Sequence, residues 1–230
     1  MIVKGLAKLT LLDFPGRVAC TIFTGGCNLR CPFCHNASLA VRAGEVDTIP
    51  EDEIFAFLEK RRGILTGVCI TGGEPLLNGD IADFIRRVRA LGYAVKLDTN
   101  GCYPDRLASL IDEGLLDYVA VDVKNSPESY ARTVGIDNID LSPIRKTVGL
   151  LKEGRVPYEF RTTVVRELHS DSDFHSIGKW IEGAEGYFLQ CFADSGDTIG
   201  EGLSAPSRAD LERYQHIVKQ YVNNTHIRGI

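Results

Sequence analysis

The stretch RVACTIFTGGCNLRCPFCHN, residues 17–36, joins an apolar, β-branched run to a loop with three cysteines. The first eight residues are typical of a buried strand, because Val, Ile, Thr and Phe favour extended backbone. Two glycines follow, and then Cys27, Cys31 and Cys34 stand with three and two residues between them. A closed metal site needs four protein ligands. The stretch therefore predicts a strand that leads into a metal-binding loop with one ligand missing.

Strand-like and helix-like segments alternate through the rest of the chain. Five more short apolar runs are predicted as strands: GVCIT (67–71), AVKLDT (94–99), DYVAVDV (117–123), PYEFRTTVV (157–165) and GYFLQCF (186–192). Amphipathic stretches between and after them are predicted as helices: 51–62, 80–92, 103–114, 141–154, 171–183 and about 207–223. Such repetition indicates an α/β fold, a partial, open TIM-type barrel of about six βα units with a mostly parallel sheet. The final THIRGI is expected to fray.

Length and composition narrow the class of protein. The 230 residues suffice for one sizeable core, so a single domain over 1–230 is expected, with the cysteine loop at 25–36. The formal net charge is −5 and no basic stripe is present, which argues against nucleic acid as a partner. No apolar run approaches the roughly 18 residues of a membrane span. Asp13 and Pro15 interrupt the N-terminal apolar run, so a cytoplasmic location without membrane contact is expected.

The seven cysteines do not suggest a disulfide framework. Their number is odd, and the chain carries no secretory pattern. Cys20, Cys69 and Cys191 lie inside apolar runs, where a buried, inert thiol is the expected state. The chemistry therefore concentrates in the cluster of three.

Three kinds of site could use the cysteine loop. A structural zinc site would need a second half-site downstream of CPFC, and none follows. A ferredoxin-type electron carrier would need a fourth cysteine for the cluster. A [4Fe–4S] cluster bound at three irons leaves the fourth iron open to a small molecule. Gly25 and Gly26 suit the last case, since glycine lets backbone approach a bulky group.

Polar residues recur where the predicted strands end. They lie in TGGEP (71–75), DTNG (98–101), Asp122 with Lys124, Arg161 and Gln190. The carboxyl ends of parallel strands meet at one edge of the sheet, where active sites of such folds lie. These side chains are therefore expected around one mouth, together with the cysteine loop.

Two motifs together resemble those of radical S-adenosylmethionine (SAM) enzymes. CNLRCPFC matches their cysteine signature, with Phe33 as its aromatic residue, and TGGEP matches their Gly-Gly-Glu motif. The segment LLDFPGRVACTIFTGGCNLRCPFCHN, the LDTNG and the DVK of VAVDVKNSP resemble glycyl-radical-enzyme activating proteins. The likeness covers nearly the whole chain. It is greatest to the activating protein of anaerobic ribonucleoside-triphosphate reductase, with pyruvate formate-lyase activase more distant.

This resemblance implies a cofactor set and a partner. Cys27, Cys31 and Cys34 would hold one [4Fe–4S] cluster, and no second cluster is expected because residues 35–68 contain no cysteine. SAM would bind the open iron and be cleaved after reduction by a flavodoxin- or ferredoxin-type protein. The resulting 5′-deoxyadenosyl radical would take a hydrogen atom from a glycine of a partner glycyl radical enzyme.

The resemblance also implies roles for individual residues near SAM. Phe33 would lie beside the cofactor, and Gly72, Gly73 and Glu74 would hold the methionine end of SAM. Arg161 is the candidate for the SAM carboxylate, because a guanidinium binds carboxylates through two hydrogen bonds. An ion pair within the sheet is the alternative role for Arg161.

Two further groups of residues match less central sites of the family. Asp98, Thr99 and Asp122 match a site for a monovalent cation, a hard ion that prefers oxygen ligands. The two aspartates could instead contact a ribose or cap a helix. Asp13 and Lys124 match positions that contact the glycyl-loop peptide.

Other functions stay open on the sequence alone. A small-molecule radical SAM enzyme similar to 7-carboxy-7-deazaguanine synthase would have a similarly short chain. An activase of another glycyl radical enzyme would share every motif. A non-catalytic iron–sulfur electron carrier would share the cysteines but would not cleave SAM.

Overall fold

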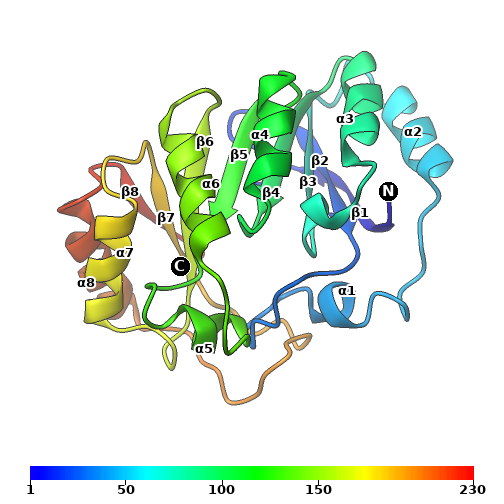
Figure 1. Cartoon of the computed structure of the whole chain (residues 1–230). Helices are drawn as coiled ribbons and strands as arrows, with labels where there is room; N and C mark the ends of the chain where they lie inside the picture. Colours follow the sequence, from blue (N-terminus) through cyan, green and yellow to red (C-terminus); the bar gives the residue numbers. More distant parts are fainter.

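The computed structural model describes residues 1–230 as one eight-stranded sheet whose spatial order follows the chain (Figure 1). The strands are β1 Val3–Thr10, β2 Ala19–Thr24, β3 Gly67–Gly72, β4 Ala94–Thr99, β5 Tyr118–Asp122, β6 Tyr158–Val164, β7 Tyr187–Cys191 and β8 Thr225–Arg228. Strands β2 to β8 run parallel, and β1 is antiparallel to β2. The predicted α/β class with a mostly parallel, open sheet is confirmed.

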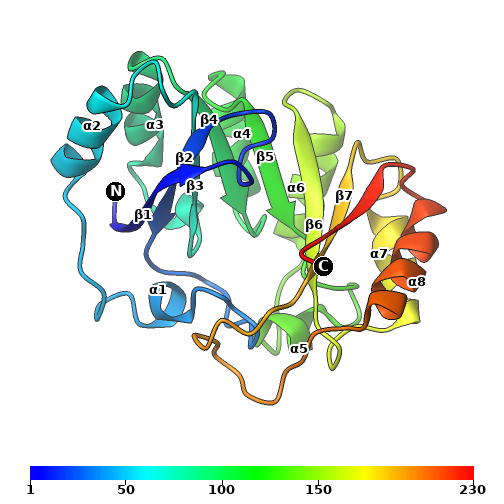
Figure 2. The same ribbon diagram turned by 180° about the vertical axis from the view of Figure 1, so that it is seen from behind.

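The longer helices lie on one face of this sheet (Figures 1 and 2). The helical elements are α1 Ala37–Val41, α2 Glu51–Lys60, the 3₁₀ turn η1 Pro75–Leu77, α3 Ile81–Ala90, α4 Pro104–Asp112, α5 Tyr130–Val134, α6 Ser142–Lys152, α7 Asp171–Trp180 and α8 Arg208–Lys219. Capping boxes at Ser170 and Ser207 begin the last two helices. None of the helices is long and apolar enough to cross a membrane.

The two faces of the sheet carry different side chains. In β4, Val95 and Leu97 are 0 % exposed and belong to the main hydrophobic core of 41 buried residues beneath the helices. Lys96 and Asp98 alternate with them and therefore point to the opposite face. We call the space on that inner face the lumen. Its carboxyl end, where the parallel strands finish, adjoins the cysteine loop.

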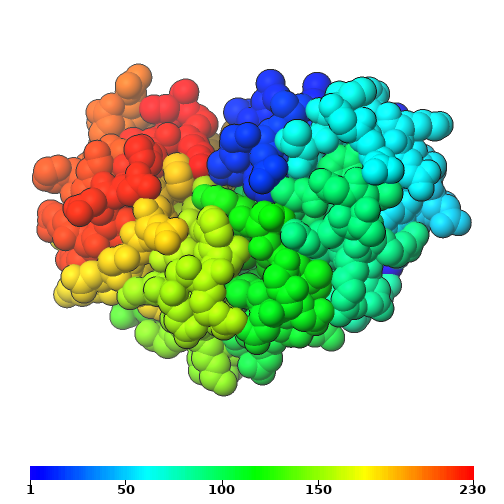
Figure 3. Space-filling view, turned by 90° about the horizontal axis from the view of Figure 1, so that it is seen from above, coloured from blue at the N-terminus to red at the C-terminus, as the bar shows by residue number.

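The sheet does not close into a complete barrel. Strands β1 and β8 are its two ends and pair only with β2 and β7. Both lie toward the viewer in Figure 2, where β8 runs beside α8. Seen along the strands, the surface has a notch between the N-terminal and C-terminal segments (Figure 3). The lumen therefore has a lateral opening.

A loop after β1 fills the amino end of the lumen. Phe14 packs there with Ala19 and Ala94, and its ring centroid lies 6.3 Å from that of Tyr118. A Cβ atom at Gly67 would lie 2.8 Å from Phe14 Cδ1, so this position has room for no side chain. The lumen is thus plugged at one end and accessible at the other.

Two strands differ from the sequence-based expectation. β1 was not predicted, because VKGLAKLT has two lysines and a glycine, and its pairing with β2 is irregular. The tail THIRGI was expected to fray, but its first four residues form β8 alongside β7. Arg228 anchors this strand through two hydrogen bonds of 2.9 Å to Glu159, a partner too distant in sequence for local patterns to reveal.

Candidate active site

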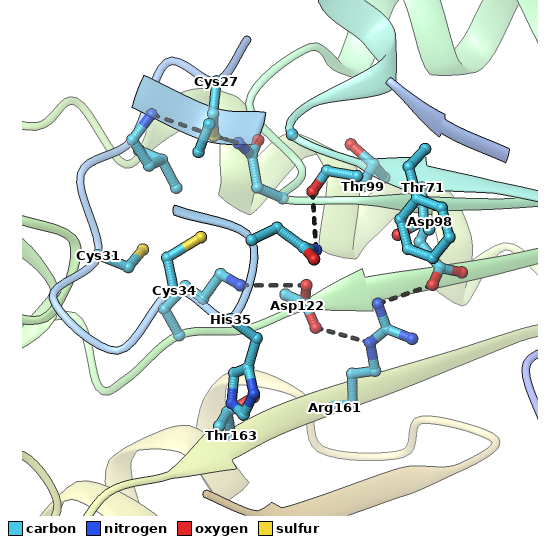
Figure 4. Close-up of a pocket in the computed structure, with 18 of the residues that line it drawn as sticks. Cys27, Cys31, Cys34, His35, Thr71, Asp98, Thr99, Asp122, Arg161 and Thr163 are labelled. Carbon is cyan, nitrogen blue, oxygen red and sulfur yellow. Dashed lines mark hydrogen bonds and ion pairs between the residues drawn. The ribbon is translucent and has the colours of Figure 1, made fainter. Parts of the chain in front are cut away.

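A cavity of about 400 Å³ occupies the lumen beside the cysteine loop, a volume within the range of ligand sites. It brings together most of the residues proposed from the sequence (Figure 4). These are Asp13, Cys27, Cys31, Phe33, Cys34, Gly72, Gly73, Asp98, Thr99, Asp122, Lys124, Arg161 and Gln190. Glu74 is the one proposed residue outside the lining.

A second, smaller core holds the cysteine loop. Leu29 and Phe33 are buried there with residues of α5, α6 and the loops after β6 and β7. The Arg30 N–H donates to Val134 O at 2.9 Å, and its guanidinium donates to the carbonyls of Cys27 and Leu29 at 2.7 and 2.8 Å. The loop is therefore fixed by the protein itself.

The three thiols suit a multi-iron cluster better than a single metal ion. All three cysteines are free, and no three His, Cys, Asp or Glu side chains are grouped as one metal ion would need. In a four-iron cluster each cysteine binds a different iron, so the thiols stand apart. Burial raises the pKa of Cys31 to about 12, and metal binding is what deprotonates such a thiol. The donor set fits a [4Fe–4S] cluster.

The glycines of TGGEP allow the end of β3 to touch the cysteine loop. A Cβ atom at Gly73 would lie 1.9 Å from Gly26 O, and one at Gly72, whose φ is +111°, would lie 2.4 Å from Thr24 N. The Glu74 N–H then donates to Gly26 O at 2.8 Å. These glycines thus fix the distance between the cysteine loop and the rest of the cavity.

Glu74 is fully buried behind the cavity wall. Its carboxylate accepts hydrogen bonds from the Leu76 N–H at 3.0 Å, the Thr99 hydroxyl at 2.8 Å and the Asn100 N–H at 2.7 Å. Burial raises the pKa of Glu74 to about 7 although these donors oppose the shift. In this structure Glu74 braces the end of β4, and its contact with SAM stays a prediction.

Five charged side chains form a chain of ion pairs across the lumen, which we call the charge ladder: Lys96, Asp98, Arg161, Asp122 and Lys124. Lys96 pairs with Asp98, and Arg161 Nη2 lies 2.9 Å from the other oxygen of Asp98. Arg161 Nε lies 2.6 Å from Asp122 Oδ1, and Lys124 Nζ lies 3.0 Å from Asp122 Oδ2. Figure 4 shows Arg161 between the two aspartates, across from the cysteines.

The ladder keeps its members charged despite burial. Burial alone would raise the pKa of Asp122, but Arg161 and Lys124 hold it well below its usual range. Burial would likewise lower the pKa of Lys124, yet Asp122 holds it above its ordinary value. The same balance, with Arg161 and Lys96 as partners, lowers the pKa of Asp98. Alternating opposite charges thus stabilise each other in the lumen.

Several lining residues of the cavity were not proposed from the sequence, Asn100 among them, and neither was Lys96 beside the cavity. The Asn100 side chain donates to Asn28 Oδ1 at 2.8 Å and lies 3.8 Å from Cys27 Sγ, linking β4 to the cysteine loop. Asn-Gly after a strand is typical of a simple turn, which hid this role. Lys96 belongs to the ladder, and the period-2 alternation of AVKLDT could have placed it on the face of Asp98.

A strap between β7 and α8, residues 193–206, crosses the cysteine loop on its outer side (Figures 1 and 2). The Asp197 carboxylate accepts from the Ser38 N–H at 3.0 Å and the Ser38 hydroxyl at 2.7 Å, and it pairs with Arg42 at 2.9 Å. The Gly200 N–H donates to Pro32 O at 2.7 Å. The strap therefore covers the loop from the side opposite the cavity.

Comparison with known proteins agrees with this geometry. The family model of the radical SAM superfamily matches residues 21–181. A Methanocaldococcus jannaschii protein with the provisional name glycyl-radical enzyme activating enzyme is 33 % identical over 100 % of this chain and 96 % of its own. Pyruvate formate-lyase 1-activating enzyme of Escherichia coli is 27 % identical over 91 % of this chain and 92 % of its own. The 7-carboxy-7-deazaguanine synthase of Methanopyrus kandleri is 39 % identical, over 48 % of this chain and 51 % of its own.

Solved structures share the fold. A domain of a pyruvate-formate lyase-activating enzyme from Bacteroides vulgatus has a TM-score of 0.59 at 18 % identity, covering 71 % of this chain and 99 % of that one. Streptococcus suis SuiB bound to its precursor peptide SuiA has a TM-score of 0.72 at 16 % identity. That match covers 91 % of this chain and 48 % of SuiB, so the chain spans about half the length of SuiB.

Proposed function

The chain belongs to the radical SAM superfamily, and from this premise we propose that it activates a glycyl radical enzyme. The protein is a radical SAM enzyme, which uses a [4Fe–4S] cluster and SAM. The proposed partner is anaerobic ribonucleoside-triphosphate reductase, and the proposed electron source is a flavodoxin- or ferredoxin-type protein. An electron carrier without catalysis is set aside, because the superfamily consists of SAM-dependent enzymes.

The observation that carries the proposal is similarity over the full length. The relative named for glycyl-radical enzyme activation matches all of this chain and nearly all of its own. The Escherichia coli activating enzyme also matches along nine-tenths of both chains. Similarity that extends beyond the motifs supports a shared partner-binding surface, since the cofactor motifs alone occupy only the first strands.

The cavity supplies places for both cofactors. Cys27, Cys31 and Cys34 would hold the cluster, which together with SAM supplies one-electron cleavage of SAM and abstraction of a hydrogen atom. Arg161 is oriented by its two aspartates and lines the cavity, leaving Nη1 for a carboxylate of the ligand.

A peptide loop can reach this centre through the lateral opening. Asp13 and Gln190 line the cavity from the two sides of the open sheet, and Lys124 lines it near the cysteine loop, with its ammonium 6.0 Å from the ring centroid of Phe33. The Thr21 hydroxyl donates to Asp13 Oδ2 at 2.5 Å, which turns that carboxylate into the lumen. We propose that Asp13 and Lys124 contact the backbone of the glycine-bearing loop.

Mixing the reconstituted, reduced protein with SAM and the reductase tests the proposal. The expected result is a glycyl doublet in the electron paramagnetic resonance spectrum, together with 5′-deoxyadenosine and methionine. A reductase whose radical glycine is replaced by alanine is the matched control and should give no doublet. SAM cleavage without a doublet on the reductase, but with one on another glycyl radical enzyme, would correct the partner. The absence of a doublet on every glycyl radical enzyme tested would overturn the activase proposal.

A small-molecule reaction is the second candidate. The Methanopyrus kandleri synthase has a higher identity than the full-length relatives, although over about half of each chain. Such an enzyme would turn over a small molecule without any protein partner. Incubation of the reduced protein with SAM and the substrate of the Methanopyrus kandleri enzyme, followed by product analysis, separates the two candidates.

A further inference from the structure

Every oxygen of the two carboxylates in the charge ladder already has a cationic partner. Asp98 gives one oxygen to the Lys96 ammonium and the other to Arg161. Asp122 gives one oxygen to Arg161 and the other to Lys124. A monovalent cation held by Asp98 and Asp122, as the family resemblance implies, would have to share an oxygen with one of these cationic side chains or displace it. The residues present therefore do not fit a free-cation site.

The charges of the ladder lead to the same conclusion. The ladder holds three cationic side chains and two carboxylates, and the Asp13 carboxylate also lines the cavity. The charges of the lumen are therefore already balanced, and no net negative charge is left for a further cation to neutralise. A further cation would add repulsion from three nearby positive charges.

We propose that Lys96 is the built-in counter-ion of this site, so that SAM binds without a monovalent cation. Lys96 is 1 % exposed, and its ammonium lies 4.0 Å from Cys69 Sγ and 6.0 Å from the ring centroid of Tyr118. Asp98 is its only ion-pair partner. The ammonium thus serves one carboxylate that points into the SAM cavity.

Lys96 acts through Asp98 and is a positioning residue. It neutralises the Asp98 oxygen that Arg161 does not use, and Asp98 in turn orients the guanidinium. Without Lys96, that oxygen would lose its cationic partner and keep only the weak contact with the Cys69 thiol at 3.8 Å. A small monovalent cation could then take the vacated position, since it satisfies the same charge and oxygen preference. The inference rests on the SAM cavity and is independent of which partner is activated.

The first experiment uses the unaltered holoenzyme. The affinity for SAM is measured by equilibrium dialysis under anaerobic conditions, in potassium chloride and in choline chloride of equal ionic strength. Choline is too bulky for a site between buried side chains. The two dissociation constants are expected to agree within about twofold. A loss of affinity of about tenfold or more in choline, about 1.4 kcal/mol, would overturn the proposal.

The second experiment removes the counter-ion with Lys96→Met, which keeps the length of the side chain. The SAM affinity of this variant is expected to fall about tenfold in choline and to return in potassium. Lys8→Met, at an exposed lysine on β1, is the matched control and should show no cation dependence. An affinity of Lys96→Met that is the same in both salts would contradict the inference.

Thermal unfolding of the chain without cluster and SAM gives a readout besides cofactor binding. The midpoint of Lys96→Met is expected to fall by about 5–15 °C in choline and to rise again with potassium, because a cation that binds only the folded state stabilises it. The wild-type midpoint should not respond to potassium. The double variant Lys96→Met with Asp98→Asn removes the orphaned carboxylate and should lose the response. A potassium response that persists in this double variant would show that the cation acts elsewhere and would overturn the assignment.

Discussion

The outer and inner faces of the same strands both bury side chains but are stabilised in different ways. In β6, Phe160 on the outer face is 0 % exposed and packs under the helices, while Glu159 on the inner face is 1 % exposed and pairs with Arg228. The outer face gains its stability from apolar area removed from water. The inner face uses charges that must be paired to be tolerated there. The degree of burial alone therefore does not distinguish side chains that pack in the core from side chains that face the lumen. The chemical type of the buried side chain does distinguish them.

The largest effect is expected from the cysteine loop. Cys31→Ala removes an iron ligand, so bound iron should fall and SAM cleavage should drop below detection, measured as 5′-deoxyadenosine after reduction. Cys20→Ala is the matched control on the outer face, because Cys20 is equally buried. It should cost about 1 kcal/mol of stability and leave SAM cleavage intact. Cleavage retained in Cys31→Ala would remove that thiol from the ligand set.

The next largest effects are expected for Phe160 and Arg161, which are neighbours on opposite faces of β6. Phe160→Ala should lower the free energy of unfolding by about 3–5 kcal/mol through the cavity it leaves. Arg161→Met should lower it by a similar amount, about 3–5 kcal/mol, because Asp98 and Asp122 would each lose a buried partner. Urea denaturation measures both.

The two variants are expected to differ in their affinity for SAM. The folded fraction of Phe160→Ala should bind SAM normally, whereas Arg161→Met should bind it at least about tenfold more weakly. Equal SAM affinity in the two variants would mean that the inner face is as purely structural as the outer one.

A smaller effect comes from Glu74, which is buried between the faces at the end of β3. Its pKa is raised from an ordinary 4.5 to about 7 by burial, so the folded state holds the proton more tightly than the unfolded state. Its contribution is therefore most favourable below about pH 4.5 and is lost as the pH rises to about 7, an amount of about 3 kcal/mol. As the pH rises from 5 to 8, the urea midpoint of the wild type should fall more than the midpoint of Glu74→Gln. If the urea midpoints of the two proteins changed with pH in the same way, the prediction that folding raises the pKa of Glu74 would be wrong.

The smallest effect is expected from a substitution in the strap, which lies on neither face of the sheet. Asp197→Ala removes the exposed contacts to Ser38 and Arg42 and should cost about 1 kcal/mol or less. Proteolysis should nevertheless cut residues 193–206 faster, since those contacts attach the strap to α1. An unchanged cleavage rate would show that the bond from Gly200 to Pro32 is sufficient.

Much of this architecture could be predicted from local pattern. Apolar runs between turn residues revealed six of the eight strands, because buried parallel strands are nearly continuous in apolar residues. β1 and β8 escaped because both are end strands whose partners, Thr24 and Tyr187 among them, lie far along the chain or beyond a turn. An apolar sequence pattern reveals the segments whose side chains are buried, but an end strand buries few side chains.

The site was predictable in its members but not in their contacts. Cysteine spacing, polar strand ends and the family motifs identified most of the residues that line the cavity but missed others, such as Thr21, Phe23, Ala40 and Thr163. The pairing of Arg161 with two aspartates could not be foreseen, because it depends on the register that sets Asp122 opposite Arg161. The same holds for Glu74, whose carboxylate turns away from the cavity to receive the Asn100 N–H.

The agreement between spatial order and chain order of the strands bears on synthesis of the protein on the ribosome. Each strand that emerges finds its neighbour already made, so the sheet can grow from its N-terminal edge. Asp98 then emerges two residues after Lys96, and Asp122 two residues before Lys124, so each carboxylate has a cation at hand as its strand forms. Arg161 arrives last and joins the two pairs. Each carboxylate of the charge ladder thus has one cationic partner within two residues of itself, and only the links through Arg161 depend on β6.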